Sequence, residues 1–447
     1  MALLNKLLAG YSISNEMIYR TGSTSLPLEH DTILYPASNI SISTGRSSTG
    51  TILTLTTDYT FSDEDTRLTT SAGSAVYTKL AIVNGTYQNM TLYVNYKTVG
   101  DYAKTEDLNR NFTFRNKLIN GGLGIWQRGT SLAITTAGSA YYQADRWNNT
   151  VVGTSSATTY SRQTFTPGQV DVPGNPKYYM RHAITSGGDS TNGRNSILQS
   201  IEGIETFAGE TCVVSFYAKA NAAKNITVEI VQNYGTGGST TTYITPVKFG
   251  ITTTWAKYVV PIAVPSITGK TIGTDSDYLA LLIWMSAGSA NNTRSSTLGI
   301  QTGTFDFAQF QIEKGSVPTE FEQRPPQVEL SLCQRYYQIL ASGAEAANAG
   351  VGSGQCFGVT SCLITTRLPV ELRVKPSAVE LSSVSHFNVL QASSGSQTCT
   401  SMGLDAATSK KVIELSVGVA SGLSAGNATC LRCDNTASAL MAVSAEF

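Results

Sequence analysis

Short runs of β-branched and aromatic residues, separated by clusters of Gly, Asn, Ser and Thr, recur along the whole sequence. Runs of this length are typical of β-strands, and the polar clusters between them are typical of turns. The repeat of three to four residues that marks an amphipathic helix is scarce. A chain of many strands buries its apolar faces by packing sheets together or by closing them into barrels. The sequence therefore predicts an all-β protein.

Changes in composition divide the chain into consecutive parts. Residues 1–100 contain β-runs, and we expect the last two to form a hairpin, because Asn84-Gly85 is a favoured two-residue turn. Residues 101–114 are polar, lack β-runs until their end and are predicted to be a linker. Residues 115–325 hold the longest series of strands, which is sufficient for a two-sheet sandwich of the jelly-roll type.

One amphipathic helix is expected, directly after the predicted sandwich. Pro325 and Pro326 end the strands, and apolar residues then recur at every fourth position. The recurring residues are Val328, Leu332, Tyr336 and Leu340. Residues 326–342 are therefore predicted to be a helical connector. Residues 343–447 return to β-runs and are predicted to form a C-terminal β tip domain.

The charge balance argues against two classes of ligand. Charged residues make up 14% of the chain, and 31 Lys and Arg residues match 31 Asp and Glu residues. Without a basic field, nucleic acid and anionic membranes are not expected as main ligands. Asn5 and Lys6 interrupt the first apolar run, which is too short for a signal peptide. We expect a soluble chain whose hydroxyl and amide groups suit neutral hydroxylated ligands.

The seven cysteines are spread unevenly, which disfavours a disulfide framework. Only Cys212 precedes residue 330. Cys430 and Cys433 form a C-x-x-C pair, and Cys356 with Cys362 would complete four zinc ligands. However, five residues separate that second pair, more than the usual two to four, and no histidines cluster nearby. Free, partly buried thiols are the preferred interpretation, and neither a metal nor a cofactor is predicted.

The sequence supplies little for catalysis. Its three histidines fall in different predicted domains, and no nucleophile, zinc-protease or phosphate-loop motif occurs. Glu202, Glu205 and Glu210 lie close together in the sequence, and a glycosidase needs two correctly placed carboxylates. Solvated loop charges are the preferred interpretation of these three residues. We therefore expect a protein that is not an enzyme.

The aromatic residues of the predicted sandwich give the strongest indication of a ligand. A flat ring beside Asp, Arg, Gln or Asn matches the apolar face and polar rim of a sugar. Trp284 continues an apolar run and is predicted to be buried; we favour an anchoring role for Trp126 and recognition for Trp147. Alternatively, Asp145 and Arg146 pair with each other at a strand end. The candidate glycan-binding residues are Trp147, Tyr141, Tyr142, Asp145, Arg146, Trp126 and Arg128.

Six segments occur in an order that is specific as a set. They are "LINGGLGIWQRG", "YYQADRW", "SILQSIEGIETFAGETCVVSFYAKA", "ITVEIVQNYGTGGS", "TTTWAKYVVPIAVPSITGKTIG" and "TGTFDFAQFQIEKGSVPTEFEQRP". Over about residues 115–340 this order resembles a module of bacteriophage tail fibres, and it is similar to jelly-roll carbohydrate-binding modules attached to glycoside hydrolases. Members of that family usually begin with "NGDF", whereas this chain has "NGGL". Gly122 stands where the family has its acidic residue, so any binding of metal or sugar by that residue is lost here. Residues 60–110 resemble the N-terminal region of phage tail proteins.

This resemblance implies a homotrimeric tail fibre subunit of a virion, made in the cytoplasm of the host bacterium. It would attach to other tail or baseplate proteins through residues 1–110 and bind host surface polysaccharide without cleaving it. The alternative is a structural fibre or adaptor whose sandwich is a spacer and whose C-terminal domain alone contacts the host. A depolymerase is disfavoured because the sequence lacks a long series of similar coils, and a secreted adhesin because it lacks a signal peptide.

Overall fold

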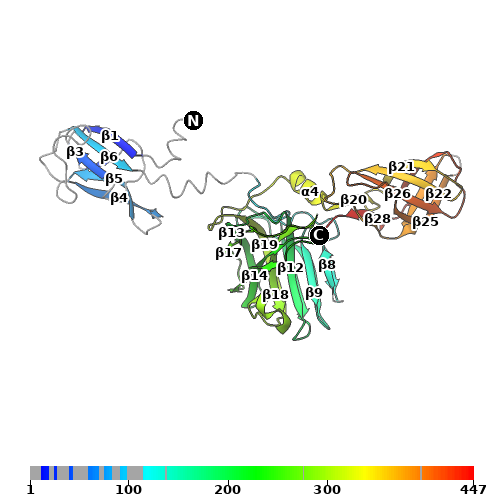
Figure 1. Cartoon of the computed structure of the whole chain (residues 1–447), viewed down its shortest axis with the longest axis horizontal. Helices are drawn as coiled ribbons and strands as arrows, with labels where there is room; N and C mark the ends of the chain where they lie inside the picture. Colours follow the sequence, from blue (N-terminus) through cyan, green and yellow to red (C-terminus); the bar gives the residue numbers. More distant parts are fainter. Residues whose placement is uncertain are drawn as a thin grey trace. The chain divides into compact units, whose positions relative to one another are not determined.

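The computed structural model describes residues 114–135, 138–274, 276–392 and 395–447, and it describes six earlier strands by their backbone. The chain separates into two compact units, Met1–Thr113 and Phe114–Phe447. Strands make up nearly all of the regular structure, so the prediction of an all-β protein is confirmed (Figure 1). In the described ranges, no helix combines the length and apolar character that are needed to cross a bilayer.

The first unit contains two three-stranded antiparallel sheets. Their strands are β1 (Ser12–Tyr19), β6 (Thr91–Lys97) and β3 (Ile40–Ser43), then β2 (Ser25–Pro27), β5 (Ala75–Ile82) and β4 (Tyr59–Thr69). The predicted hairpin is wrong, because β5 pairs with β2 and β4 whereas β6 pairs with β1 and β3. Residues 101–113 of the predicted linker lie outside the described residues.

The second unit begins with a sandwich of two antiparallel sheets. The six-stranded sheet has the order β17-β13-β19-β11-β10-β7. Its strands are β17 (Ala256–Ala263), β13 (Thr211–Ala220), β19 (Gly303–Lys314), β11 (Tyr178–Ser186), β10 (Ala157–Thr164) and β7 (Ser131–Ile134). Apart from β11 and β10, no two neighbours in this order are consecutive in the sequence, which is the crossed connectivity of a jelly roll rather than of a simple meander.

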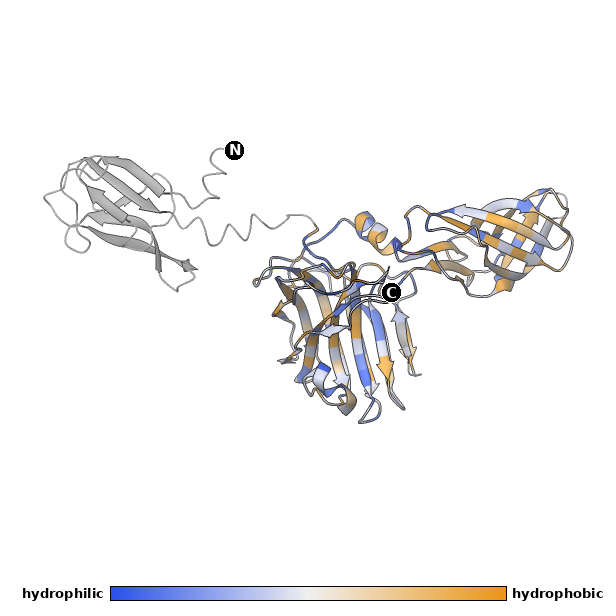
Figure 2. Ribbon diagram, in the orientation of Figure 1, coloured by the Kyte–Doolittle hydropathy of each residue, from blue (hydrophilic) through white to orange (hydrophobic). Residues whose placement is uncertain are grey.

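The seven-stranded sheet has the order β15-β14-β18-β12-β9-β8, with β16 also paired to β14. Its strands are β15 (Thr242–Tyr243), β14 (Lys224–Asn233), β18 (Tyr278–Ala287), β12 (Arg194–Glu202), β9 (Asn148–Val152), β8 (Gly138–Tyr142) and β16 (Val247–Ile251). All of its described ladders are antiparallel. Figure 2 shows hydrophobic and hydrophilic residues interleaved along the strands of the second unit.

Strand β18 has apolar side chains on both faces. Leu279, Leu281 and Ile283 belong to the core that residues of both sheets share, together with Phe216 of β13. Because side chains alternate along a strand, Leu282 and Trp284 lie on the opposite face, where they form a second apolar cluster. Trp284 is therefore buried, as predicted, but on the outer face of its sheet.

The connecting helix is shorter than predicted. Helix α4 spans Pro326–Gln334, and strand β20 (Tyr337–Ser342) follows almost at once. Strand β20 pairs with β28 (Leu440–Ser444), which also pairs with β23 (Val379–Leu381). The predicted helix over 326–342 is corrected because these ladder hydrogen bonds to a strand distant in sequence override the local repeat of apolar residues.

A closed barrel follows, with the strand order β21-β22-β26-β25-β24-β27. Its strands are β21 (Gly350–Cys356), β22 (Ser361–Arg367), β26 (Val412–Val419), β25 (Gly395–Leu404), β24 (Phe387–Gln391) and β27 (Ala428–Cys433). All seven cysteines of the chain are free, and all except Cys430 are buried. Among the described residues, no group of His, Cys, Asp or Glu is arranged to hold a metal ion.

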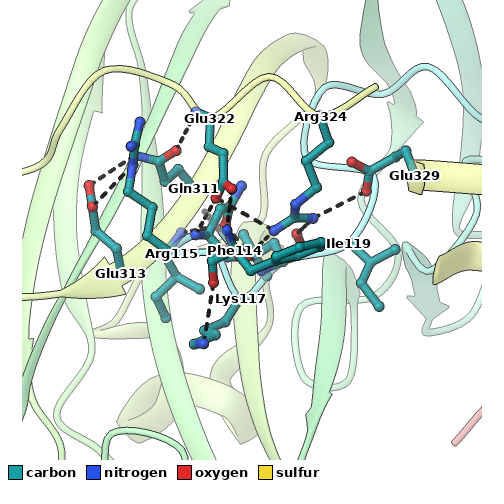
Figure 3. Close-up of polar contacts among 12 residues, drawn as sticks. Phe114, Arg115, Lys117, Ile119, Gln311, Glu313, Glu322, Arg324 and Glu329 are labelled. Carbon is teal, nitrogen blue, oxygen red and sulfur yellow. Dashed lines mark hydrogen bonds and ion pairs between the residues drawn. The ribbon is translucent and has the colours of Figure 1, made fainter. Parts of the chain in front are cut away.

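The first residues of the second unit are clamped to the segment after β19 (Figure 3). The Arg324 guanidinium donates hydrogen bonds to the carbonyl groups of Leu118, at 3.0 Å, and of Asn116. It also forms an ion pair with Glu329 of helix α4 at 3.4 Å. The Glu322 carboxylate accepts the backbone N–H of Asn116 at 2.7 Å. These contacts join the start and end of the sandwich and orient the helix that leads to the barrel.

Candidate functional site

The outer face of the seven-stranded sheet has an apolar centre. The ladders place Leu198 of β12 opposite Leu282 of β18, and Val231 of β14 opposite Ala280 of β18. These four positions share the face that carries Trp284, away from the core between the sheets. The register of the strands thus assembles one flat apolar floor from three strands.

A cleft of about 300 Å³ lies over this floor. It crosses the sheet from β15 to β8 and also receives side chains from outside the sheet. Its lining residues are Tyr142, Asn148, Thr150, Arg194, Leu198, Ser200, Val231, Asn233, Thr241, Tyr243, Tyr278, Ala280, Leu282, Arg294 and Phe447. Ligand pockets in proteins have this composition, in which an apolar lining carries a few polar groups that fix orientation.

Four aromatic rings surround the floor. Tyr243 is 53% exposed, so its ring presents open surface to a ligand. The rings of Tyr278 and Phe447 lie 5.1 Å apart between centroids. At the other end, the Asn148 amide donates to the Tyr142 hydroxyl at 3.2 Å. Burial raises the pKa of both Tyr142 and Tyr278, so these phenols are neutral hydrogen-bonding groups near pH 7.

A buried carboxylate organises the charged side of the cleft. Glu229 of β14 is fully buried, and its two oxygens accept hydrogen bonds from Arg294 Nε and Nη2, both at 2.9 Å. Trp284 Nε1 donates to the same carboxylate at 2.9 Å. Arg294 comes from helix α3 (Asn292–Ser295), and its guanidinium carbon lies 4.2 Å from the centroid of the Tyr243 ring. Glu229 therefore fixes Arg294, which in turn supports Tyr243.

Arg194 is the second cation of the cleft. Its Nε donates to the Ser196 hydroxyl at 2.9 Å, and its guanidinium carbon lies 4.4 Å from the centroid of the Trp284 ring. Burial, together with the nearby charge of Arg294, lowers the pKa of Arg194 to about 10. Within the described ranges, Arg194 forms no ion pair with a carboxylate.

The lining combines flat apolar surface with hydrogen-bonding groups. The floor and the tyrosine rings offer flat apolar surface, and the amides, hydroxyls and guanidinium groups offer hydrogen bonds. None of the described residues that line the cleft is Asp or Glu. Glu229 lies beneath the lining with both oxygens engaged. A pair of free carboxylates, which glycoside hydrolysis requires, is thus not found among these residues.

Three of the predicted glycan-binding residues lie in the interior. Trp147 is fully buried; its ring packs 4.4 Å from Phe310, and its Nε1 donates to the Asn120 carbonyl at 3.1 Å. Trp126 is 8% exposed, which agrees with its predicted anchoring role. Asp145 is 1% exposed and accepts the backbone N–H of Gln127 at 2.9 Å. Burial raises the pKa of the Asp145 carboxyl group.

The two predicted arginines lie where the sandwich meets the C-terminal segment. Arg146 is 2% exposed, forms an ion pair with Glu446 and lies 3.3 Å from the centroid of the Tyr336 ring. Arg128 lies 3.5 Å from the centroid of the Tyr337 ring and 3.5 Å from the Glu446 carboxylate. Arg146 therefore has Glu446 as its carboxylate partner, so the alternative of a local pair with Asp145 is not what the structure shows.

The two predicted tyrosines lie at or near the cleft. Tyr142 lines the cleft itself, and Tyr141 and Arg128 line a neighbouring pocket of about 360 Å³ together with Tyr142. A ligand role for the seven predicted residues stays a prediction. Sequence reasoning did not single out Tyr243, Tyr278 or the two cleft arginines. The unbroken apolar run of β18 was one available signal, because a strand that is apolar on both faces must be covered on both.

No protein-family model matches the chain, and no curated protein does. Among solved structures, a putative sugar binding protein from Bacteroides thetaiotaomicron is 18% identical, covers 45% of this chain and 100% of its own, and has a TM-score of 0.27. A CBM22 xylan-binding domain from Paenibacillus barcinonensis is 13% identical over 42% of this chain and 95% of its own, with a TM-score of 0.24. The enzymatically active domain of a bacteriophage CBA120 tailspike protein is 11% identical; the match covers 45% of this chain and 22% of the tailspike chain, with a TM-score of 0.28. At such scores the assignment of a jelly-roll-type sandwich rests on this chain's own strand order.

Proposed function

We propose that the cleft on the seven-stranded sheet binds carbohydrate. The observation that carries this proposal is the exposed ring of Tyr243 beside an apolar floor, held by Arg294 at 4.2 Å. A sugar ring has apolar C–H faces and a polar rim, so it stacks on an aromatic face while its hydroxyls reach amides and phenols. Asn148, Asn233 and Tyr142 supply such groups around the floor.

Binding without cleavage is the proposed activity. The carboxylate beneath the cleft, Glu229, is saturated by Arg294 and Trp284 and cannot approach a glycosidic oxygen without breaking these contacts. The cleft is therefore proposed to be a lectin-like site and the chain not to be an enzyme.

We further propose that the chain is a bacteriophage tail fibre subunit. The support is the order of six sequence segments over about residues 115–340 and the weaker resemblance of residues 60–110. In this proposal the fibre is a homotrimer of the virion tail, residues 1–110 attach it to other tail proteins, and the cleft holds host surface polysaccharide. Three weak sites on one fibre would raise its avidity by roughly 10²- to 10⁴-fold where geometry allows.

The test of the cleft compares two aromatic variants of the full-length chain. Tyr243→Ala removes the exposed ring of the cleft, and Phe357→Ala removes a ring that is 64% exposed in the barrel. Binding to immobilised bacterial surface polysaccharides is measured for both. We expect Tyr243→Ala to weaken binding by at least tenfold and Phe357→Ala to leave it unchanged, because a few aromatic residues often supply most of the binding energy. Unchanged binding by Tyr243→Ala would count against the cleft.

The alternative places the host contact in the C-terminal domain and makes the sandwich a spacer. It is favoured by Phe357 and Val359, which are 64% and 62% exposed between β21 and β22. This alternative predicts the reverse result, in which Phe357→Ala weakens binding and Tyr243→Ala does not.

The proposal of a tail fibre has a separate test. The solution mass of the 47.6 kDa chain should correspond to a trimer, and antibodies against the chain should label phage tails.

A further inference from the structure

The two cations and one anion of the cleft leave one positive charge uncompensated. Glu229 accepts two hydrogen bonds from Arg294, both at 2.9 Å, so these two residues neutralise each other. The remaining donor to this carboxylate is the neutral Trp284 indole. Arg194 stands on the same face of the sheet, where its guanidinium carbon lies 4.4 Å from the centroid of the Trp284 ring, and it forms no ion pair among the described residues. The cleft therefore has an excess cation at its wall.

Most of the hydrogen-bonding capacity of Arg194 is unused by the protein. A guanidinium carries five N–H donors, and among the described residues its side chain donates one hydrogen bond, from Nε to the Ser196 hydroxyl at 2.9 Å. Removing a cation from water is costly unless an anion or several acceptors replace the water. The depressed pKa of Arg194, about 10, has the same cause, since burial and Arg294 both disfavour its charge.

We infer that the carbohydrate held in the cleft is acidic, and that Arg194 binds its carboxylate or sulfate group. This inference rests on the proposed function of the cleft and specifies its ligand class. A planar guanidinium binds such a group through two parallel hydrogen bonds, which fix orientation as well as charge. The sugar ring then lies over Leu198, Leu282 and Ala280 with its acidic substituent toward the arginine.

Among the described residues, no Asp or Glu side chain lines the cleft beside Arg194. Glu229 cannot turn toward Arg194 without leaving both Arg294 and Trp284. The other nearby carboxylate, Glu446, forms ion pairs with Arg128 and Arg146 at the junction. The inference also revises the expectation of a neutral ligand: the net charge of the whole chain is zero, but the cleft has its own local charge.

The test measures binding of the full-length chain to matched polysaccharides. The probes are alginate, hyaluronan and polygalacturonate, each with its carboxyl-reduced neutral form, and dextran sulfate with dextran. We expect at least one acidic polymer to bind at least about tenfold more tightly than its neutral form, with an affinity that falls as salt is added. The two kinds of pair distinguish a carboxylate from a sulfate.

Three variants connect this preference to one side chain. Arg194→Gln should abolish the difference between acidic and neutral forms, and Arg194→Lys should retain part of it. Arg162→Gln serves as the matched control, because Arg162 also stacks on a ring, Tyr178 at 4.3 Å, but belongs to β10 of the other sheet. Unfolding curves establish that each variant is folded.

The outcomes distinguish a failure of this inference from a failure of the proposed carbohydrate binding. Equal binding of acidic and neutral forms by the unmodified chain overturns the inference and leaves carbohydrate binding standing. An acidic preference that survives in Arg194→Gln overturns the role of Arg194. Absence of binding to every polymer, together with no effect of Tyr243→Ala on any host polysaccharide, overturns the proposed function itself.

Discussion

The guanidinium of Arg294 and the carboxylate of Glu229 form a two-pronged ion pair in which both N–O distances are 2.9 Å. Glu229 belongs to strand β14, whereas Arg294 belongs to the four-residue helix α3 that follows β18. The pair therefore ties an irregular segment to the rigid sheet. Because the same guanidinium stacks on Tyr243, the shape of the cleft depends on a carboxylate that lies beneath its lining.

Replacing that carboxylate should destabilise the protein. In Glu229→Gln the Arg294 side chain, which is 25% exposed, loses its only ion pair among the described residues. Breaking a buried pair by removing one partner costs about 3–5 kcal/mol; partial exposure of Arg294 argues for the lower end. Denaturant unfolding followed by tryptophan fluorescence measures the change.

The matched control is Glu210→Gln, which breaks the pair of Glu210 with Lys314. Those side chains are 42% and 67% exposed, and exposed pairs contribute at most about 1 kcal/mol. Equal stability losses in the two variants would show that Glu229 has no special role.

The junction between the sandwich and the C-terminal segment provides a second prediction. Glu446→Gln leaves Arg146, which is 2% exposed, without its carboxylate, and we expect a loss of about 3–5 kcal/mol in unfolding free energy. All four tryptophans lie in the sandwich, so their fluorescence reports whether a contact from residue 446 stabilises that domain. Glu380→Gln, an exposed carboxylate of β23, should change stability by less than about 0.5 kcal/mol. A wild-type transition in Glu446→Gln would contradict this account.

His182 should make the protein less stable in mild acid. It is 2% exposed, its ring lies 4.7 Å from that of Tyr160, and burial lowers its pKa to about 3, from 6.5. Between these values the unfolded chain binds a proton that the folded chain does not, so stability is full above pH 6.5 and falls as the pH decreases. From pH 7 to pH 5 the loss is about 2 kcal/mol.

Comparing unfolding free energies at pH 7 and pH 5 tests this origin of acid sensitivity. His182→Phe suits the aromatic surroundings and should remove about 2 kcal/mol of the pH-dependent change, whereas His386→Gln should retain it. If His182→Phe responds to pH as the unmodified chain does, other groups cause the effect.

The cysteines should be nearly inert in the folded protein. Burial raises the pKa of Cys212, Cys362 and Cys399 to about 12, and only the thiolate reacts with thiol reagents. At pH 8 we expect a disulfide reagent to label one thiol rapidly, Cys430, which is the half-buried one, and all seven only in denaturant. Cys430→Ser should eliminate the rapid phase. Several rapid thiols in the native chain would argue against the packed barrel core.

Local pattern was sufficient to identify the strands. The segments "YLALLIWMSA" and "TCVVSFYAKA" coincide with β18 and β13. Short apolar and β-branched runs between turn residues are typical of buried strands. The same reasoning predicted the buried state of Trp284. It failed after Gln334, where apolar residues at helical spacing belong instead to a strand that pairs with β28.

The cleft was predictable only in part. Tyr142 was among the candidate residues and does line the cleft, whereas Trp147 and Arg146 satisfied the same criterion of an aromatic beside a polar group and are buried. Sequence neighbours do not reveal which face a side chain takes in a sheet of seven strands. That is decided by register, since a shift of one residue moves every side chain to the opposite face.

Composition and periodicity by themselves determined that this chain is built of β-strands, where most of those strands lie and that its surface is rich in hydroxyls. Only the tertiary structure decided that Arg194, Tyr243, Tyr278 and Arg294, from separate parts of the sandwich, line one cleft. The physical reason is the range of the forces involved. Strand formation reflects residues two apart in the sequence. The cleft depends instead on ladders between strands far apart in sequence and on a buried carboxylate that holds Arg294.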